Sequence, residues 1–96
     1  MHIVEDPDAQ RALDDAIERW EGTPIAWDAV TWVLMRDPNL GKALTEDGSI
    51  RAFTYEGARS IKQPTITMVY EIVGKHEIVI RDARFTEPKY GQVGRA

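Results

Sequence analysis

The first part of the chain carries apolar residues at the spacing of an α-helix. Between positions 9 and 20 they recur three and four residues apart, which places them along one side of a helix. They are Ala9, Ala12, Leu13, Ala16, Ile17 and Trp20. Asp6 followed by Pro7 is a typical helix start, because an Asp side chain accepts from the free amides and Pro fits the first helical position. Gly22 marks the end of this helix.

A second helix is predicted from Thr23-Pro24, which repeats the start signal, to Asp37-Pro38. The residue before a proline avoids helical geometry, so the helix ends there. Its buried side is expected to carry Ala26, Trp27, Val30, Val33 and Leu34. Trp32 points away from that side. We expect Trp32 to pack in the core, with a partner surface as the alternative.

Beyond residue 49 the apolar period becomes two, which is typical of β-strands. Three strands are predicted, over residues 50–55, 65–72 and 77–85, with loops over residues 39–49 and 57–63. The run Ile78-Val79-Ile80 indicates that the last strand is central. A short strand is also expected at His2–Glu5.

These elements predict an α+β domain in the order βααβββ. Two amphipathic helices need an apolar surface to cover, and one face of the sheet is the large surface available. We therefore expect a two-helix hairpin on one face of a curved antiparallel sheet. Residues 1–96 are expected to form a single domain, because two halves would each be too small to bury a core.

Composition narrows the function classes. The chain has no cysteine, which excludes disulfides and thiolate metal sites. Its histidines, His2 and His76, stand apart, so we expect neither a metal nor a cofactor. The acidic start lacks the apolar core of a signal peptide, and no apolar run approaches the ~20 residues of a membrane span. A cytoplasmic protein without membrane contact is expected.

Charge is distributed unevenly along the chain. The net charge is −4, yet residues 50–96 hold eight basic and five acidic residues. A basic face on the sheet half would suit RNA, because cations hold phosphates and aromatic rings stack on bases. The nucleic-acid-binding candidates are Arg59, Lys62, Arg81 and Lys89. Arg81 is expected on one strand face, with Asp82 and Arg84 on the other. The alternative is a strand edge covered by ion pairs.

Several stretches resemble the RelE/ParE toxins. Leu34–Pro38, Gly41–Leu44 and Ile50–Phe53 resemble the linker and second strand of that family. Ile66–Ile72 resembles the third strand, and Glu77–Arg84 resembles the aliphatic strand that follows. The resemblance covers residues 3–90, in the element order derived above.

The resemblance implies the toxin of a type II toxin–antitoxin pair, wrapped by a cognate antitoxin protein. RelE-type members cut messenger RNA in the ribosome without a metal, using basic residues and a C-terminal tyrosine. By position, the catalytic candidates are Arg51, Arg84 and Tyr90. Cleavage needs a base, an acid and cations that stabilise the charged phosphorane.

One position departs from the family. Where the third strand commonly has arginine, this chain has Thr67. Two alternatives to a ribonuclease therefore stay open. One is a non-catalytic toxin that inhibits DNA gyrase, as ParE-type members do. The other is a non-toxic protein-binding domain on the same scaffold.

Overall fold

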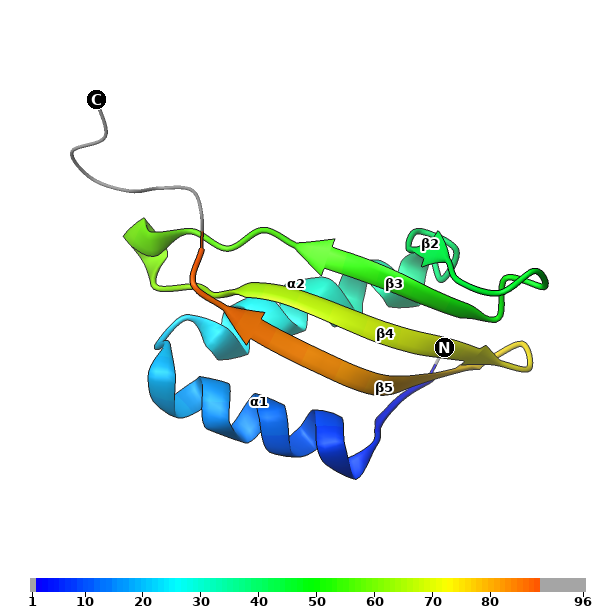
Figure 1. Cartoon of the computed structure of the whole chain (residues 1–96), viewed down its shortest axis with the longest axis horizontal. Coiled ribbons are helices and arrows are strands. Elements are labelled where there is room, and N and C mark those ends of the chain that lie inside the picture. Colours follow the sequence, from blue (N-terminus) through cyan, green and yellow to red (C-terminus); the bar gives the residue numbers. More distant parts are fainter. Residues whose placement is uncertain (1, 89–96) are drawn as a thin grey trace.

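The computed structural model describes residues 2–88 of the chain. The elements, in chain order, are β1 (His2–Glu5), α1 (Pro7–Arg19), α2 (Thr23–Arg36), β2 (Lys42–Ala43), β3 (Ile50–Tyr55), the 3₁₀ helix η1 (Arg59–Ile61), β4 (Thr65–Val73) and β5 (Glu77–Thr86). The predicted α+β class is confirmed, with two helices between the first strand and the later ones (Figure 1). None of the helices within residues 2–88 is long and apolar enough to cross a membrane.

The sheet has five strands in the order β1-β5-β4-β3-β2. The central position predicted for the last strand is confirmed, because β5 lies between β1 and β4. The expectation of an all-antiparallel sheet is wrong, since β1 pairs with β5 in parallel. The connection between these parallel neighbours runs through both helices and then through β2, β3 and β4. The predicted loop over residues 39–49 also contains the two-residue strand β2, which pairs with β3.

Both helices lie on the same side of the sheet, with α2 behind the strands and α1 running along β5 (Figure 1). Their apolar sides meet the sheet in one core. The buried residues of this core are Ala9, Leu13, Ala26, Trp27, Val30, Leu34, Ile66, Met68, Tyr70, Ile78, Ile80 and Ala83. Two predictions fail here: Trp32 is 59% exposed and Ile17 is 43% exposed. Trp32 lies on the side of α2 opposite the sheet, where core packing is out of reach.

A β-bulge decides which residues of β5 face the helices. Before it, Ile78 and Ile80 are buried in the core; after it, Ala83 is the next core residue. The register with β4 shifts between Val69 and Tyr70, so Arg81 is an extra residue on β5. The bulge reverses the alternation of the strand. Residues 82 and 84 therefore face away from the helices.

Tyr70 fastens the segment after α2 to the core. Its side chain is fully buried on β4. Its hydroxyl donates to the Pro38 carbonyl at 2.6 Å and accepts from the Gly41 amide at 3.0 Å. A Cβ on Gly41 would lie 2.7 Å from this hydroxyl, so only glycine fits there. One phenol thus satisfies two backbone groups of an otherwise irregular segment.

We predict that Tyr70→Phe lowers the free energy of unfolding by about 1–3 kcal/mol, because it leaves the buried Gly41 amide without a partner. Urea denaturation measures the effect. Thr54→Val is the matched control: it removes an exposed hydroxyl from the neighbouring strand and should change stability by less than about 0.5 kcal/mol. Equal stability of Tyr70→Phe and the unchanged protein would contradict the anchoring role.

A second prediction concerns alkaline pH. Burial raises the pKa of Tyr70 above its ordinary value of 10.0, although the Gly41 amide and the charge of Arg51 act in the opposite direction. A raised pKa stabilises the fold below pH 10.0, and this contribution is lost as the pH rises through the pKa of the folded state. Unfolding free energies at about pH 9 and about pH 11 should therefore differ more for the unchanged protein than for Tyr70→Phe. Identical pH dependence would refute this assignment.

Candidate functional site

Arg51 is held by backbone carbonyls on the helix-covered side of the sheet. Its register partner is Tyr70, a core residue, so both side chains leave the sheet on that side. The guanidinium donates to the carbonyls of Gly48 at 2.9 Å, Gly41 at 2.8 Å and Asn39 at 3.1 Å. Arg51 therefore ties residues 39–48 to β3. Its donors are directed at the protein's own backbone.

Arg84 lies on the opposite side of the sheet. It is exposed and pairs in register with Thr67, which is also exposed. Thr67 in turn pairs with Thr54, whose hydroxyl lies 3.4 Å from that of Thr67. The sheet itself thus separates Arg84 from Arg51. Two of the three predicted catalytic residues do not share a site.

Arg81, the bulge residue, forms an ion-pair network. Its guanidinium contacts the Glu71 carboxylate at 2.6 Å and the Asp6 carboxylate at 3.2 Å. These hydrogen bonds, with that to Glu71 the larger cause, raise the pKa of Arg81. The expectation that Arg81 points to the face opposite Asp82 is wrong: it binds Glu71, whose strand position is on the side away from the helices. The predicted alternative of an ion-paired strand holds for Arg81 alone, because neither Asp82 nor Arg84 forms an ion pair within residues 2–88.

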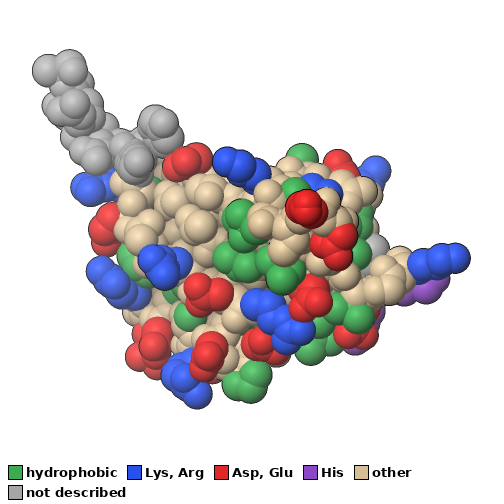
Figure 2. Space-filling view, turned by 45° about the vertical axis from the view of Figure 1, so that its right-hand side comes forward, with side chains coloured by type: hydrophobic (Ala, Val, Ile, Leu, Met, Phe, Trp, Pro, Cys, Tyr) green, Lys and Arg blue, Asp and Glu red, His purple; other side chains and the backbone are tan. Residues whose placement is uncertain are grey.

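The side of the sheet away from the helices is here called the open face. Figure 2 shows apolar side chains gathered on this part of the surface, with acidic and basic side chains interspersed. By register its apolar residues are Val4, Ile50, Ala52, Val69, Val73 and Val79. Its charged residues are Lys42, Glu71, Glu77, Arg81, Asp82 and Arg84. Three acids face three bases in that set, so the described part of this face is not the cationic surface that the sequence predicted.

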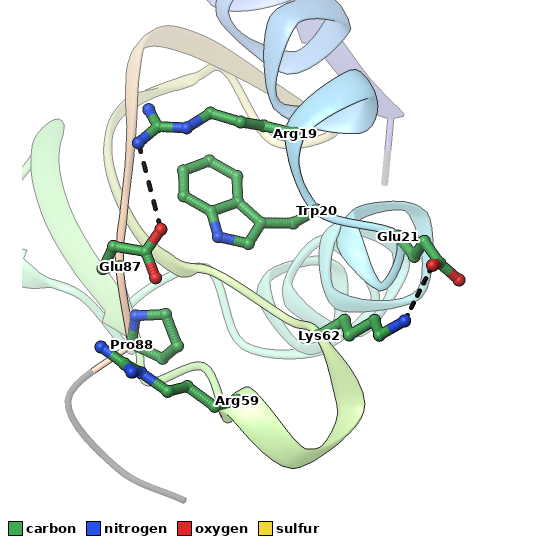
Figure 3. Close-up of a pocket in the computed structure, with 7 residues that line it drawn as sticks. All are labelled: Arg19, Trp20, Glu21, Arg59, Lys62, Glu87 and Pro88. Carbon is green, nitrogen blue, oxygen red and sulfur yellow. Dashed lines mark hydrogen bonds and ion pairs between the residues drawn. The ribbon is translucent and has the colours of Figure 1, made fainter. Parts of the chain in front are cut away.

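Two predicted nucleic-acid-binding residues, Arg59 and Lys62, line a cavity of about 380 Å³ at the end of the sheet (Figure 3). Arg59 comes from η1, and Lys62 follows it. The remaining lining residues are Arg19, Trp20, Glu21, Glu87 and Pro88. Arg19 and Trp20 were not predicted from the sequence as residues of a site. The sequence places both residues at the end of the predicted first helix. It does not show that this helix end lies close to the connection between β3 and β4.

The charges of this cavity are partly neutralised. Lys62 contacts Glu21 at 3.0 Å, and Arg19 contacts Glu87 at 4.0 Å. The Arg19 guanidinium also lies 4.5 Å from the centre of the Trp20 ring. Trp20 is only 8% exposed, so this ring is not free to stack on a base. Both carboxylates are ion-paired, so the described lining residues offer cations for an anion but no unpaired carboxylate.

Lys62 has an unusual backbone conformation, with φ 55° in the left-handed region. Such a conformation costs free energy for a residue other than glycine. The Gly22 amide donates to the Lys62 carbonyl at 2.8 Å, and a Cβ on Gly22 would clash with the Ile61 carbonyl. Close contact between the helix connection and η1 therefore imposes this conformation. It directs the Lys62 side chain towards Glu21.

Lys89 and Tyr90, the remaining predicted residues, lie outside the described residues. Within residues 2–88, no group of three His, Asp or Glu side chains is placed to hold a metal ion. No protein-family model matches this chain, and no curated protein compared with it matches in sequence.

We predict that Arg51 acts on stability. Arg51→Lys should lower the free energy of unfolding by about 1–2 kcal/mol, because a lysine cannot reproduce the three bonds made by the guanidinium fork. Arg84→Lys is the matched control on the open face and should change it by less than about 0.5 kcal/mol. Chemical denaturation of both variants decides the question. Equal effects would contradict the structural role of Arg51.

Proposed function

We propose that this chain is a toxin of the RelE/ParE kind that acts by binding a partner protein and does not cut RNA. The resemblance in sequence suggests the class. The observed order of elements, with two helices between the first strand and the later strands, agrees with that class. DNA gyrase is the target that the resemblance implies for such a toxin.

The observation that supports a toxin without catalytic activity is the separation of Arg51 from Arg84. Phosphoryl chemistry without a metal needs several groups around one phosphate. Arg51 binds three carbonyls on the helix-covered side, whereas Arg84 pairs in register with Thr67 on the open face. The two cannot contact the same phosphate without a change in the fold.

The open face suits a protein partner. Ala52 and Val69 are neighbours in register on β3 and β4, and both are only partly exposed. The Arg81–Glu71 ion pair lies on the same face. A surface with an apolar centre and polar surroundings is typical of protein interfaces. We infer that the antitoxin covers this face.

A second candidate is RNA binding at the cavity of Figure 3. Three cations, Arg19, Arg59 and Lys62, line it. Arg59 forms no ion pair within residues 2–88, which leaves it available for a phosphate. This cavity favours the ribonuclease alternative.

Induced expression in bacteria tests the proposal. We expect growth arrest with intact messenger RNA and inhibited gyrase, and no relief by Arg84→Ala or Tyr90→Phe. Val69→Arg should relieve the arrest and abolish binding of the antitoxin, because it places a charge in the apolar centre of the open face. Ile17→Arg, at an exposed apolar position on α1, is the control and should leave the arrest unchanged.

Two outcomes would contradict the proposal. Harmless expression of the folded chain without any antitoxin would exclude a toxin. Cleaved messenger RNA, with cleavage abolished by Arg59→Ala and Lys62→Ala together, would establish the second candidate instead.

A further inference from the structure

The outer side of α2 exposes large apolar side chains. Thr23, Ala26, Trp27, Val30 and Leu34 form its buried side. At 3.6 residues per turn, the opposite side carries Ile25, Trp32 and Met35. These three are 68%, 59% and 41% exposed. A helix that is apolar on both sides is typical of a buried position, so this side lacks a cover within residues 2–88.

The charges on this side are arranged symmetrically about Trp32. Asp28 lies four residues before it and Arg36 four residues after it, so all three share one side of the helix. The Arg36 guanidinium lies 4.7 Å from the centre of the Trp32 ring. Neither Asp28 nor Arg36 takes part in an ion pair among the described residues.

This symmetry matches a second copy of the same helix. In two antiparallel helices related by a twofold axis at residue 32, a residue four positions before the axis faces the residue four positions after it. Asp28 of one protomer then faces Arg36 of its partner, and the reverse pair forms on the other side. A twofold contact requires such a self-complementary surface. An acid and a base on one side of a helix always face each other in this way about their midpoint, and here the midpoint is the exposed Trp32.

We propose that this chain forms a symmetric dimer through α2, with Trp32 at the twofold axis and two Asp28–Arg36 ion pairs between the protomers. The exposed Ile25 lies seven residues before Trp32 on the same side of the helix, which adds apolar contact beyond the charges. This inference is independent of the proposed toxicity, because the dimer surface and the open face lie on opposite sides of the molecule.

The contact is small, so the dimer is weak. A helix of 14 residues is about 21 Å long. An interface centred on one such helix is at the small end of specific interfaces, where association is transient. Trp32 supplies the main apolar contribution, since tryptophan and arginine are enriched among residues that dominate interfaces. We expect dissociation constants in the micromolar range.

Sedimentation velocity of the full chain at increasing concentration tests the dimer. Asp28→Arg and Arg36→Asp should each weaken association by at least about tenfold, because each places like charges opposite one another twice in the dimer. The double variant exchanges the two charges and should restore the original affinity. Trp32→Ala should abolish association. Ile17→Ala, which shortens an exposed apolar side chain on α1, is the control and should have no effect.

A chain that stays monomeric at millimolar concentration would overturn the proposal. So would a dimer that tolerates both single charge reversals, or one that the double variant fails to restore. Circular dichroism of each variant establishes that α2 remains folded, which separates loss of association from loss of structure. The assay uses no antitoxin and no target, so its failure leaves the proposed toxin activity untouched.

Discussion

The alternation of side chains along the strands determines what this protein can do with its charged residues. Both helices cover one face of the sheet, so every second strand residue on β3, β4 and β5 is committed to that side. Arg51 falls on the covered side. Arg84 falls on the open face because the bulge at Arg81 reverses the alternation of β5. If β5 alternated regularly through Arg81, Arg84 would point towards the helices and Ala83 would leave the core.

The covered side holds polar groups only where each has a partner. Tyr70 and Arg51 are adjacent in register, and together they bind the backbone of residues 38–48. A buried phenol or guanidinium is costly unless its hydrogen bonds are made. Here the irregular segment between α2 and β3 supplies the partners, and the side chains order the segment in return. An arginine that resembles a catalytic residue in sequence is therefore a stabilising residue in the structure.

The sequence was sufficient for both helices, the four longer strands and their order, because periods of 3.6 and 2 residues are local properties. The starts of both helices and the central position of β5 were predicted for the same reason. The two-residue strand β2 and the 3₁₀ helix η1 fell within predicted loops. Three features depend on contacts distant in sequence and were missed: the parallel pairing of β1, the exposure of Trp32 and the bulge at Arg81. The cavity beside Arg19 was missed for the same reason. Its residues come from α1, η1 and the end of β5, and no local pattern links them.

The exposure of Trp32 changes how the two sides of the molecule relate to each other. The open face has an apolar centre with an ion pair, and the outer side of α2 has a tryptophan between an acid and a base. The whole thickness of the helix and sheet layers lies between them, so a partner on one surface does not touch the other. A dimer through α2 would leave both open faces accessible. The dimer would then present two open faces. A target with two binding sites would bind such a dimer more tightly than it binds one protomer.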